Sequence, residues 1–502
     1  MNLRGQSRIG TATIVGTDAV PIEVQVDIGS GLPAFALVGL GDTAVQEARE
    51  RVRSAIRAAG YGFPNARVVV NLAPAPLRKH GTGFDLPIAV GILVATGQIP
   101  PESLDGCRFA GELSLDGRIR EIPGLLAHVL RSARDDRVFV GPPEASRYAG
   151  CIPGLRFRAV STLRDVIRPE SSTTTDTESR LVEGLRPSQP DLSDIIGHEL
   201  ARRALVIAAA GGHNMLFIGP PGSGKTMLAR RLPGLLPPLD SDERLQTALV
   251  HSVAGLDERP ALEGVRPFRA PHHSCSVGGL VGGGVPPRPG EVSLAHNGVL
   301  FLDEIAQFGP AALQYLRQPV EDGTVTLVRA DGRVRYPARF AFVAASNPCP
   351  CGYAGDPVRA CSCPQSITDK YMNRIGGPLM DRIDIHLRID RIDPARLVSG
   401  TTGEPSNSVR SGVLEARERA IRRNGCITAH LAGVDLYRSC NLSDATQRLL
   451  VSSAARQHLS GRGITRLLRV SRTCADLAGV ERVGIEHIEE AGMLRALSGV
   501  QG

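Results

Sequence analysis

A glycine-rich loop that follows a short apolar run constrains the fold of this 502-residue chain more than any other feature. Residues 219–226 read GPPGSGKT directly after the apolar residues 215–218, and they fit the phosphate-loop pattern G-x-x-x-x-G-K-[ST] at every position. In this pattern a buried strand ends, and backbone N–H groups and the N-terminus of the next helix face phosphate oxygens. The lysine reaches the β- and γ-phosphates, and the threonine hydroxyl binds Mg²⁺. The pattern therefore predicts a nucleoside triphosphate site formed by Gly219, Pro220, Pro221, Gly222, Ser223, Gly224, Lys225 and Thr226.

Two further apolar runs end in polar residues that suit triphosphate hydrolysis. Residues 299–302 precede Asp303 and Glu304, and residues 340–345 lead to Asn347. A carboxylate at a strand end is a hard oxygen ligand for Mg²⁺, which predicts that role for Asp303. Its neighbour Glu304 could polarise the attacking water as a general base, and Asn347 could hold that water against the γ-phosphate. A structural alternative is that the two carboxylates merely start a helix. That alternative does not explain why a second apolar run, residues 340–345, also leads to a polar residue, Asn347.

Longer stretches carry a resemblance to a known family. They read FRAPHHSCS at 268–276, PRPGEVSLAHNGVLFLDE at 287–304, NPCPCGY at 347–353 and GPLMDRID at 377–384. The order of motifs resembles that of the AAA+ ATPases (Walker A, Walker B, sensor 1), and these stretches are similar to the ComM/YifB family, its magnesium-chelatase-like branch. The resemblance covers nearly the whole chain. It implies an α/β fold with an N-terminal Lon-protease-like domain (ribosomal protein S5 domain 2-like), a AAA+ P-loop NTPase core and a C-terminal helical lid.

Composition and the resemblance together divide the chain into four segments. Residues 1–168 would form the Lon-protease-like domain. Residues 169–187 are rich in Ser, Thr, Pro and Glu with little apolar surface to bury, which predicts a linker. Residues 188–395 would form the AAA+ core, and residues 396–502 the helical lid, the magnesium-chelatase C-terminal domain.

The N-terminal domain lacks the chemistry of a Lon-type protease. Gly83 stands where the resemblance puts the nucleophilic serine, and Leu126 stands where it puts the lysine base. A Ser–Lys dyad needs both the nucleophile and the amine that activates it. We therefore expect the fold of such a protease without its activity.

Arginines complete the catalytic set that the resemblance implies. Residues 377–384 match the segment that supplies an arginine finger to the neighbouring subunit, which points to Arg382, with Arg374 in reserve. A structural ion pair is the alternative. In the amphipathic stretch that follows residue 461, Arg462 or Arg466 would be sensor 2, and solvated surface charge is the alternative.

Four cysteines after Asn347 form a C-x-C…C-x-C pattern: Cys349, Cys351, Cys361 and Cys363. Four thiolates suit a tetrahedral Zn²⁺ that folds a loop too small for its own core. The one-residue gaps depart from the usual C-x₂-C of zinc ribbons, so a loop of free thiols stays open as the alternative. An iron–sulfur cluster is disfavoured.

Composition restricts the class of protein. A hydrophobic content of 42% with 22% charged residues is that of a soluble globular protein, and the net charge of +7 permits nucleic-acid partners without demonstrating them. The absence of Trp and the 4% of aromatic residues argue against a base-stacking platform. The start MNLRGQSRIG has no apolar signal core, and no run of about 18 apolar residues occurs. We therefore expect a cytoplasmic protein without a membrane partner.

The resemblance also implies a function. ComM-like proteins are hexameric ATPases that act as DNA helicases and promote branch migration, so we expect an ATP- and Mg²⁺-dependent ring that translocates on single-stranded or branched DNA in recombination. The glycine-rich residues 277–290 would form a mobile pore loop or a subunit-packing loop. The alternative function is a magnesium-chelatase-type motor subunit that remodels a protein partner.

Overall fold

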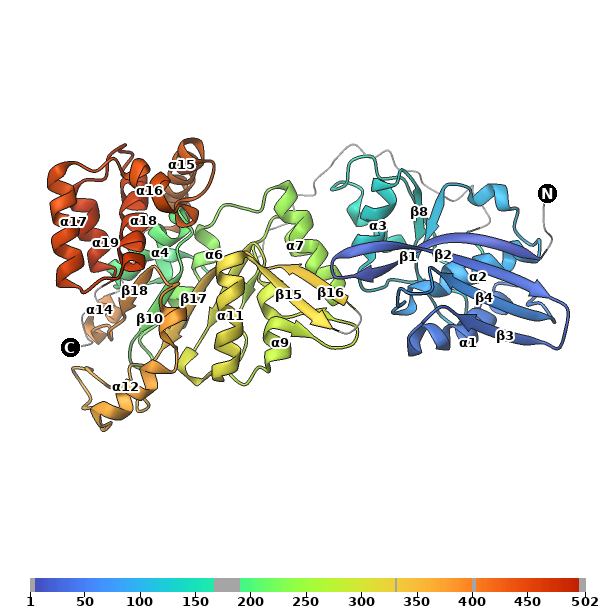
Figure 1. Cartoon of the computed structure of the whole chain (residues 1–502), viewed down its shortest axis with the longest axis horizontal. Coiled ribbons are helices and arrows are strands. Elements are labelled where there is room, and N and C mark those ends of the chain that lie inside the picture. Colours follow the sequence, from blue (N-terminus) through green and yellow to red (C-terminus); the bar gives the residue numbers. More distant parts are fainter. Residues whose placement is uncertain (1–4, 167–189, 330–331, 400–402, 496–502) are drawn as a thin grey trace.

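The computed structural model describes residues 5–166, 190–329, 332–399 and 403–495, and the predicted linker at 169–187 lies outside them. Figure 1 shows three groups of elements along the long axis: an N-terminal group in blue and cyan, a central sheet whose strands run from green to orange, and C-terminal helices in darker orange and red. Within these residues, no helix is both long and apolar enough to span a membrane.

The N-terminal group is built on a four-stranded sheet in the order β1-β2-β4-β3. Its strands alternate between buried and exposed residues, as expected for a sheet with one covered face. Helices α1 (Thr43–Ala58) and α2 (Asp85–Ala95) cover that face. The strands are β1 (Gln6–Val15), β2 (Asp18–Gly29), β3 (Ala34–Val38) and β4 (Arg67–Ala73).

A smaller parallel sheet, β5-β8-β9, and helix α3 (Leu125–Arg134) join the N-terminal group to the centre. Leu126 is fully buried and donates its backbone N–H to Ser252 Oγ at 3.3 Å. A Cβ atom added to Gly83 would lie 2.8 Å from Ile122 Cδ1. Both positions of the predicted missing dyad are thus used for packing, and the likeness to a Lon-type domain stays a prediction. The short strands here are β5 (Cys107–Phe109), β6 (Glu112–Leu113), β7 (Ile119–Arg120), β8 (Val138–Gly141) and β9 (Phe157–Ala159).

The central sheet has five parallel strands in the order β11-β14-β17-β10-β18, which confirms the predicted α/β core. Alternate side chains point to opposite faces. Met215 and Phe217 pack on the side of α4 (Glu199–Gly211), whereas Leu216 and Ile218 pack on the side of α11 (Pro310–Asp322). The strands are β10 (Met215–Ile218), β11 (Phe268–Arg269), β14 (Gly298–Leu302), β17 (Phe340–Ser346) and β18 (Ile385–Arg388).

Strand order brings the predicted motifs together. β17 lies between β10 and β14, so the carboxyl ends of the three strands meet at one edge of the sheet. Ligands of open α/β sheets bind outside the carboxyl ends of the strands. The other elements of this region are α5 (Lys225–Ala229), α6 (Leu232–Leu235), α7 (Ser241–Ala254), α8 (Arg259–Leu262), α10 (Glu291–Leu294), α12 (Gln365–Asn373), α13 (Gly377–Met380) and α14 (Pro394–Ser399).

Two antiparallel strand pairs extend from the central region. The glycine-rich stretch holds a one-turn helix, α9 (Val277–Val281), followed by β12 (Gly282–Gly283) and β13 (Arg288–Pro289). The second pair is β15 (Thr324–Arg329) and β16 (Gly332–Pro337). Tyr336 Oη donates a hydrogen bond of 2.8 Å to the Pro287 carbonyl, so the two pairs lie against each other.

The C-terminal helices pack around α18 (Gly461–Leu477), which contacts α4, α15, α16 and α19. Its predicted apolar face, including Leu467, Leu468 and Cys474, is buried. The alternative of solvated surface charge is wrong for Arg466, because α18 is surrounded and Arg466 is only 8% exposed, whereas Arg462 is exposed. The other helices are α15 (Ser406–Asn424), α16 (Gly433–Cys440), α17 (Asp444–Arg456) and α19 (Ile485–Met493).

Candidate nucleotide-binding site

The glycines of the phosphate loop are required by its backbone. Gly222 and Gly224 have φ angles of 76° and 89°, a region that side chains with a Cβ rarely adopt. A Cβ atom on Gly219 would lie 2.0 Å from the Ile389 carbonyl oxygen, so no side chain fits there. Ser223 Oγ is buried without a hydrogen-bond partner among the described residues.

Lys225 lies inside this loop. Its Nζ donates hydrogen bonds to the carbonyl oxygens of Gly219 at 2.8 Å and Pro220 at 2.9 Å, and to Asn347 Oδ1 at 3.3 Å. Burial lowers the pKa of Lys225, while the charges of Asp303 and Glu304 raise it. The predicted phosphate loop and the predicted Asn347 therefore meet at one ammonium group.

Thr226 and Asp303 form the second contact between motifs. Thr226 Oγ1 donates to Asp303 Oδ2 at 2.6 Å, and Asp303 Oδ1 accepts the backbone N–H of Glu304 at 3.0 Å. A hydroxyl from the phosphate loop and a carboxylate from the end of β14 form the hard oxygen set that holds Mg²⁺ in P-loop enzymes. The donor atoms present thus fit the predicted ion.

Glu304 has an unusual backbone conformation for a residue with a side chain. Its φ of 50° lies in the left-handed region, which costs a residue with a side chain about 1–3 kcal/mol and recurs at functional sites. Its carboxylate is partly exposed, and Oε2 lies 3.8 Å from His273 Nδ1. We did not predict this pair; the FRAPHHSCS stretch was the only signal for it.

His198 is a second residue that sequence reasoning missed. It precedes α4 with a φ of 53°, and a Cβ on Gly224 would lie 3.5 Å from its Nε2. Burial lowers the pKa of His198, and a hydrogen bond with the backbone of Ser223 partly offsets that effect. Its imidazole therefore lies beside the phosphate loop, where burial favours the neutral form.

The predicted arginines gather elsewhere, around residues 381–384. Arg382 forms an ion pair with Glu321 of α11 and donates to the Pro378 carbonyl at 2.6 Å. Arg462 lies 3.7 Å from Asp381 Oδ2, and Arg466 Nε lies 3.7 Å from Asp384 Oδ1. None of the hydrogen bonds or ion pairs described for these three arginines reaches the phosphate loop of the same chain.

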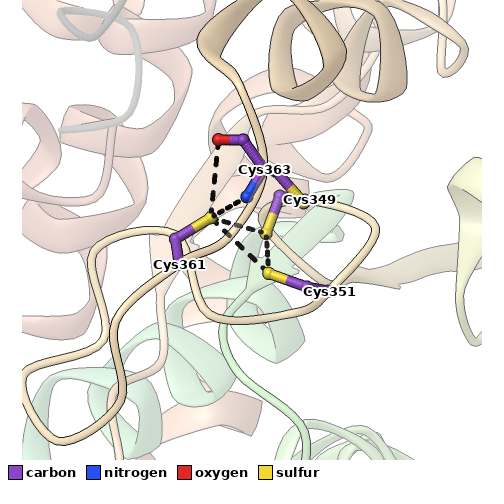
Figure 2. A group of neighbouring side chains, drawn as sticks. All are labelled: Cys349, Cys351, Cys361 and Cys363. Carbon is purple, nitrogen blue, oxygen red and sulfur yellow. Dashed lines mark hydrogen bonds between the residues drawn. The ribbon is translucent and has the colours of Figure 1, made fainter.

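The four cysteines are brought together, as predicted. Figure 2 shows their thiols converging on one point, and all four sulfur atoms lie within 4.8 Å of one another. Backbone N–H groups of Tyr353 and Ser362 lower the pKa of Cys351 to about 5. The cluster fits a single soft metal ion.

Comparison with models of known protein families identifies relatives of this chain. Three family models match: magnesium chelatase, subunit ChlI, over residues 191–397; subunit ChlI of Mg-chelatase over 24–144; and the C-terminal part of subunit ChlI over 403–495.

Three relatives illustrate the range of similarity. The competence protein ComM of Haemophilus influenzae is 41% identical over 491 residues, which cover 96% of each chain. The YifB protein of Escherichia coli is 41% identical over 504 residues, 98% of this chain and 97% of that protein. The magnesium-chelatase 38 kDa subunit of Rhodobacter capsulatus is 25% identical over 337 residues, 62% of this chain and 87% of the subunit. The chain belongs to the ComM/YifB family of magnesium-chelatase-like AAA+ proteins.

Proposed function

We propose that this chain is a ring-forming AAA+ ATPase that translocates on DNA as a helicase and promotes branch migration in recombination. The observation that carries the ATPase is the meeting of Lys225, Thr226, Asp303 and Asn347 at three adjacent strand ends. Membership of a family of AAA+ ATPases supports it.

The residues of the site divide the work of hydrolysis. Lys225 would exchange its bonds to loop carbonyls for bonds to phosphate oxygens, and Asn347 would orient the attacking water. Glu304 would accept the proton of that water. Thr226 and Asp303 would hold Mg²⁺, which would supply positive charge against the negative charge that develops on the phosphate oxygens.

The arginines support a shared site between subunits. Arg382 follows Asp381 in the chain and Arg462 pairs with Asp381, and the described contacts of the two arginines do not reach the phosphate loop of their own chain. We assign Arg382 as the finger and Arg462, the more exposed of the two sensor 2 candidates, to the γ-phosphate of the neighbouring subunit. Such contacts need a closed ring, which we take to be a hexamer.

The two hairpins, β12–β13 and β15–β16, support DNA as the substrate of the motor. Arg288 on β13 is exposed, as are Arg329 on β15 and Arg333 and Arg335 on β16. Exposed arginines neutralise phosphates regardless of sequence, which is what a translocating motor needs. The relative from H. influenzae bears the name competence protein.

A chelatase-type motor that remodels a protein partner is the second candidate. The three matching models of chelatase subunit ChlI favour it. The two candidates differ in what stimulates ATP hydrolysis.

One experiment separates them. Purified chain is given ATP and a synthetic three-strand junction, and both strand exchange and phosphate release are measured. We expect ATP-dependent branch migration and an ATPase rate that rises with DNA and falls with salt. An ATPase that ignores every form of DNA, together with co-purification of a large protein partner, would replace the DNA role by the chelatase role.

A further inference from the structure

We propose that Cys349, Cys351, Cys361 and Cys363 bind one Zn²⁺, and that the resulting metal loop, residues 349–363, holds Asn347 and the phosphate loop in their working positions. Zinc occupancy would then set the rate of ATP turnover. The effect of zinc on turnover rests on the ATPase activity proposed above. The metal site is argued independently, from the positions of the four cysteines.

The distances between the sulfur atoms fit one tetrahedral ion. Cys349 Sγ lies 3.3 Å from Cys351 Sγ and 3.6 Å from Cys361 Sγ, and the last two atoms are 3.5 Å apart. A Zn–S bond of about 2.3 Å gives sulfur–sulfur edges of about 3.8 Å in a tetrahedron. A disulfide needs about 2.05 Å, and an iron–sulfur cluster separates its thiolates more widely than one ion does.

Backbone N–H groups contact two of the four sulfur atoms. Ala354 N–H donates to Cys349 Sγ, and Cys363 N–H donates to Cys361 Sγ, both at 3.3 Å. Hydrogen bonds that orient and stabilise ligands are the usual outer shell of a metal site.

The metal loop has little else to fold it. Residues 355 and 357–360 are exposed, and Val358 is 78% exposed. The loop is tied down mainly by polar contacts, such as that of Arg391 Nε with Asp356 Oδ2 at 2.9 Å. A segment without a core gains its fold from the metal.

The metal loop also touches the nucleotide site. Cys349 is fully buried two residues after Asn347. A Cβ atom on Gly352 would lie 2.7 Å from Pro221 Cδ and 4.0 Å from Asn347 Cγ. The carbonyl of Gly355 accepts a hydrogen bond from Arg388 at the end of β18. The metal loop thus lies directly behind the residues that would face the γ-phosphate.

A shift of the metal loop should therefore act on catalysis more than on binding. Most triphosphate contacts come from the phosphate loop backbone and Lys225, which fold with the central sheet. Asn347 acts on the attacking water, and a displacement of about 1 Å in such a group can cost about 100-fold in rate.

The test compares zinc content, ATP affinity and turnover in full-length protein. The variant Cys361→Ser/Cys363→Ser removes two of the three partly exposed ligands and spares buried Cys349, and Cys151→Ser is the matched control. We expect one zinc per chain in the wild type and the control, and none in the double variant. Its kcat should fall about 10- to 100-fold with ATP affinity changed less than about threefold.

A second variant perturbs the contact and keeps the ligands. Gly352→Ala would press on Pro221, whereas Gly97→Ala adds a Cβ at another left-handed glycine with open space around it. We expect Gly352→Ala to retain zinc and lose turnover, and Gly97→Ala to change neither. The double cysteine change should add little to the defect of Asn347→Ala, because both act through the same side chain.

Three results decide the matter. Wild-type protein without zinc would overturn the metal site. If kcat is unchanged in both the double cysteine variant and Gly352→Ala, the metal loop does not position Asn347. The same conclusion follows if each of these two variants loses ATP binding as strongly as turnover. A wild-type protein that holds zinc but never hydrolyses ATP would contradict the proposed function and leave the metal site standing.

Discussion

Lys225 illustrates how one side chain ties the site together. Its ammonium is buried at the junction of the phosphate loop and the end of β17, where it contacts two carbonyls and Asn347. The hydrogen-bond partners of this buried ammonium are neutral oxygens. Charged phosphate oxygens would form stronger hydrogen bonds with it, so the position suits an anionic ligand.

Glu304→Gln tests the proposed general base. The amide keeps the shape of the side chain but cannot take a proton, so ATP binding should persist and kcat should fall about 10²–10⁴-fold. Glu263→Gln, at an exposed position after α8, is the control. Phosphate release and ATP affinity are measured side by side, and turnover at the wild-type rate would remove Glu304 from the mechanism.

Asp191 provides a prediction on pH. Burial alone would raise the pKa of Asp191, but hydrogen bonds from Ser193 and Ser406 outweigh it and lower the pKa to about 2. A depressed carboxylate pKa contributes stability that is present above its ordinary value of 3.8 and lost as pH falls towards 2. Asp191→Asn should therefore lower the free energy of unfolding at pH 6, and the difference from wild type should shrink below pH 4.

Urea unfolding at pH 6, 4 and 3 measures that difference. A gap between Asp191→Asn and the wild type that grows as the pH falls would contradict the assignment. The equivalent change at exposed Asp435, whose ion pair among the described residues is with nearby Arg438, should leave stability within about 0.5 kcal/mol at every pH.

At the scale of elements, sequence patterns predicted the three strand-to-loop junctions that carry the site. Each consists of an apolar run followed by a polar residue, so local sequence determines both the strand and its end. The pairing of Glu304 with His273, and the position of His198, depend on loops packed together from distant segments, and no local pattern encodes that contact.

Helix α18 shows why the sequence alone could not tell a buried arginine at position 466 from a solvated one. A helical period of apolar residues identifies one buried face. It does not reveal that α18 is surrounded by α4, α15, α16 and α19, so that polar side chains are buried as well. Arg466 and Arg472 are buried there. Arg466 pairs with Asp384, and Arg472 pairs with Asp476.

The arginines of β15 and β16 carry a prediction at this scale. Arg333→Ala/Arg335→Ala should weaken DNA binding and reduce the salt dependence, by about one unit of log–log slope per lost phosphate contact. ATPase activity without DNA should be unchanged. The control is Arg49→Ala/Arg53→Ala, on the exposed face of α1. Equal DNA affinity and equal salt slope in the hairpin variant and the control would exclude the hairpins as the DNA contact.

At the scale of the whole molecule, the account requires each ATP site to be completed by a second chain. Arg382→Ala and Lys225→Ala should both be inactive alone, since one lacks the finger and the other lacks the phosphate contact. Mixed together they should regain activity, because the Lys225→Ala chain lends its intact Arg382 to the other chain's phosphate loop.

Mixing Lys225→Ala with Glu304→Gln controls for the effect of assembly alone. A fully active Arg382→Ala chain would exclude the finger. Failure of the mixed rings to hydrolyse ATP, with assembly verified by light scattering, would show that the arginine does not act between chains.

The most direct test of the central claim is a structure of the Glu304→Gln chain with Mg²⁺ and ATP. The account predicts a triphosphate in the 219–226 loop, with the γ-phosphate within hydrogen-bond distance of Lys225 Nζ and Asn347, and Mg²⁺ beside Thr226 and Asp303. A triphosphate bound away from Lys225, or a Mg²⁺ that neither Thr226 nor Asp303 approaches, would contradict it.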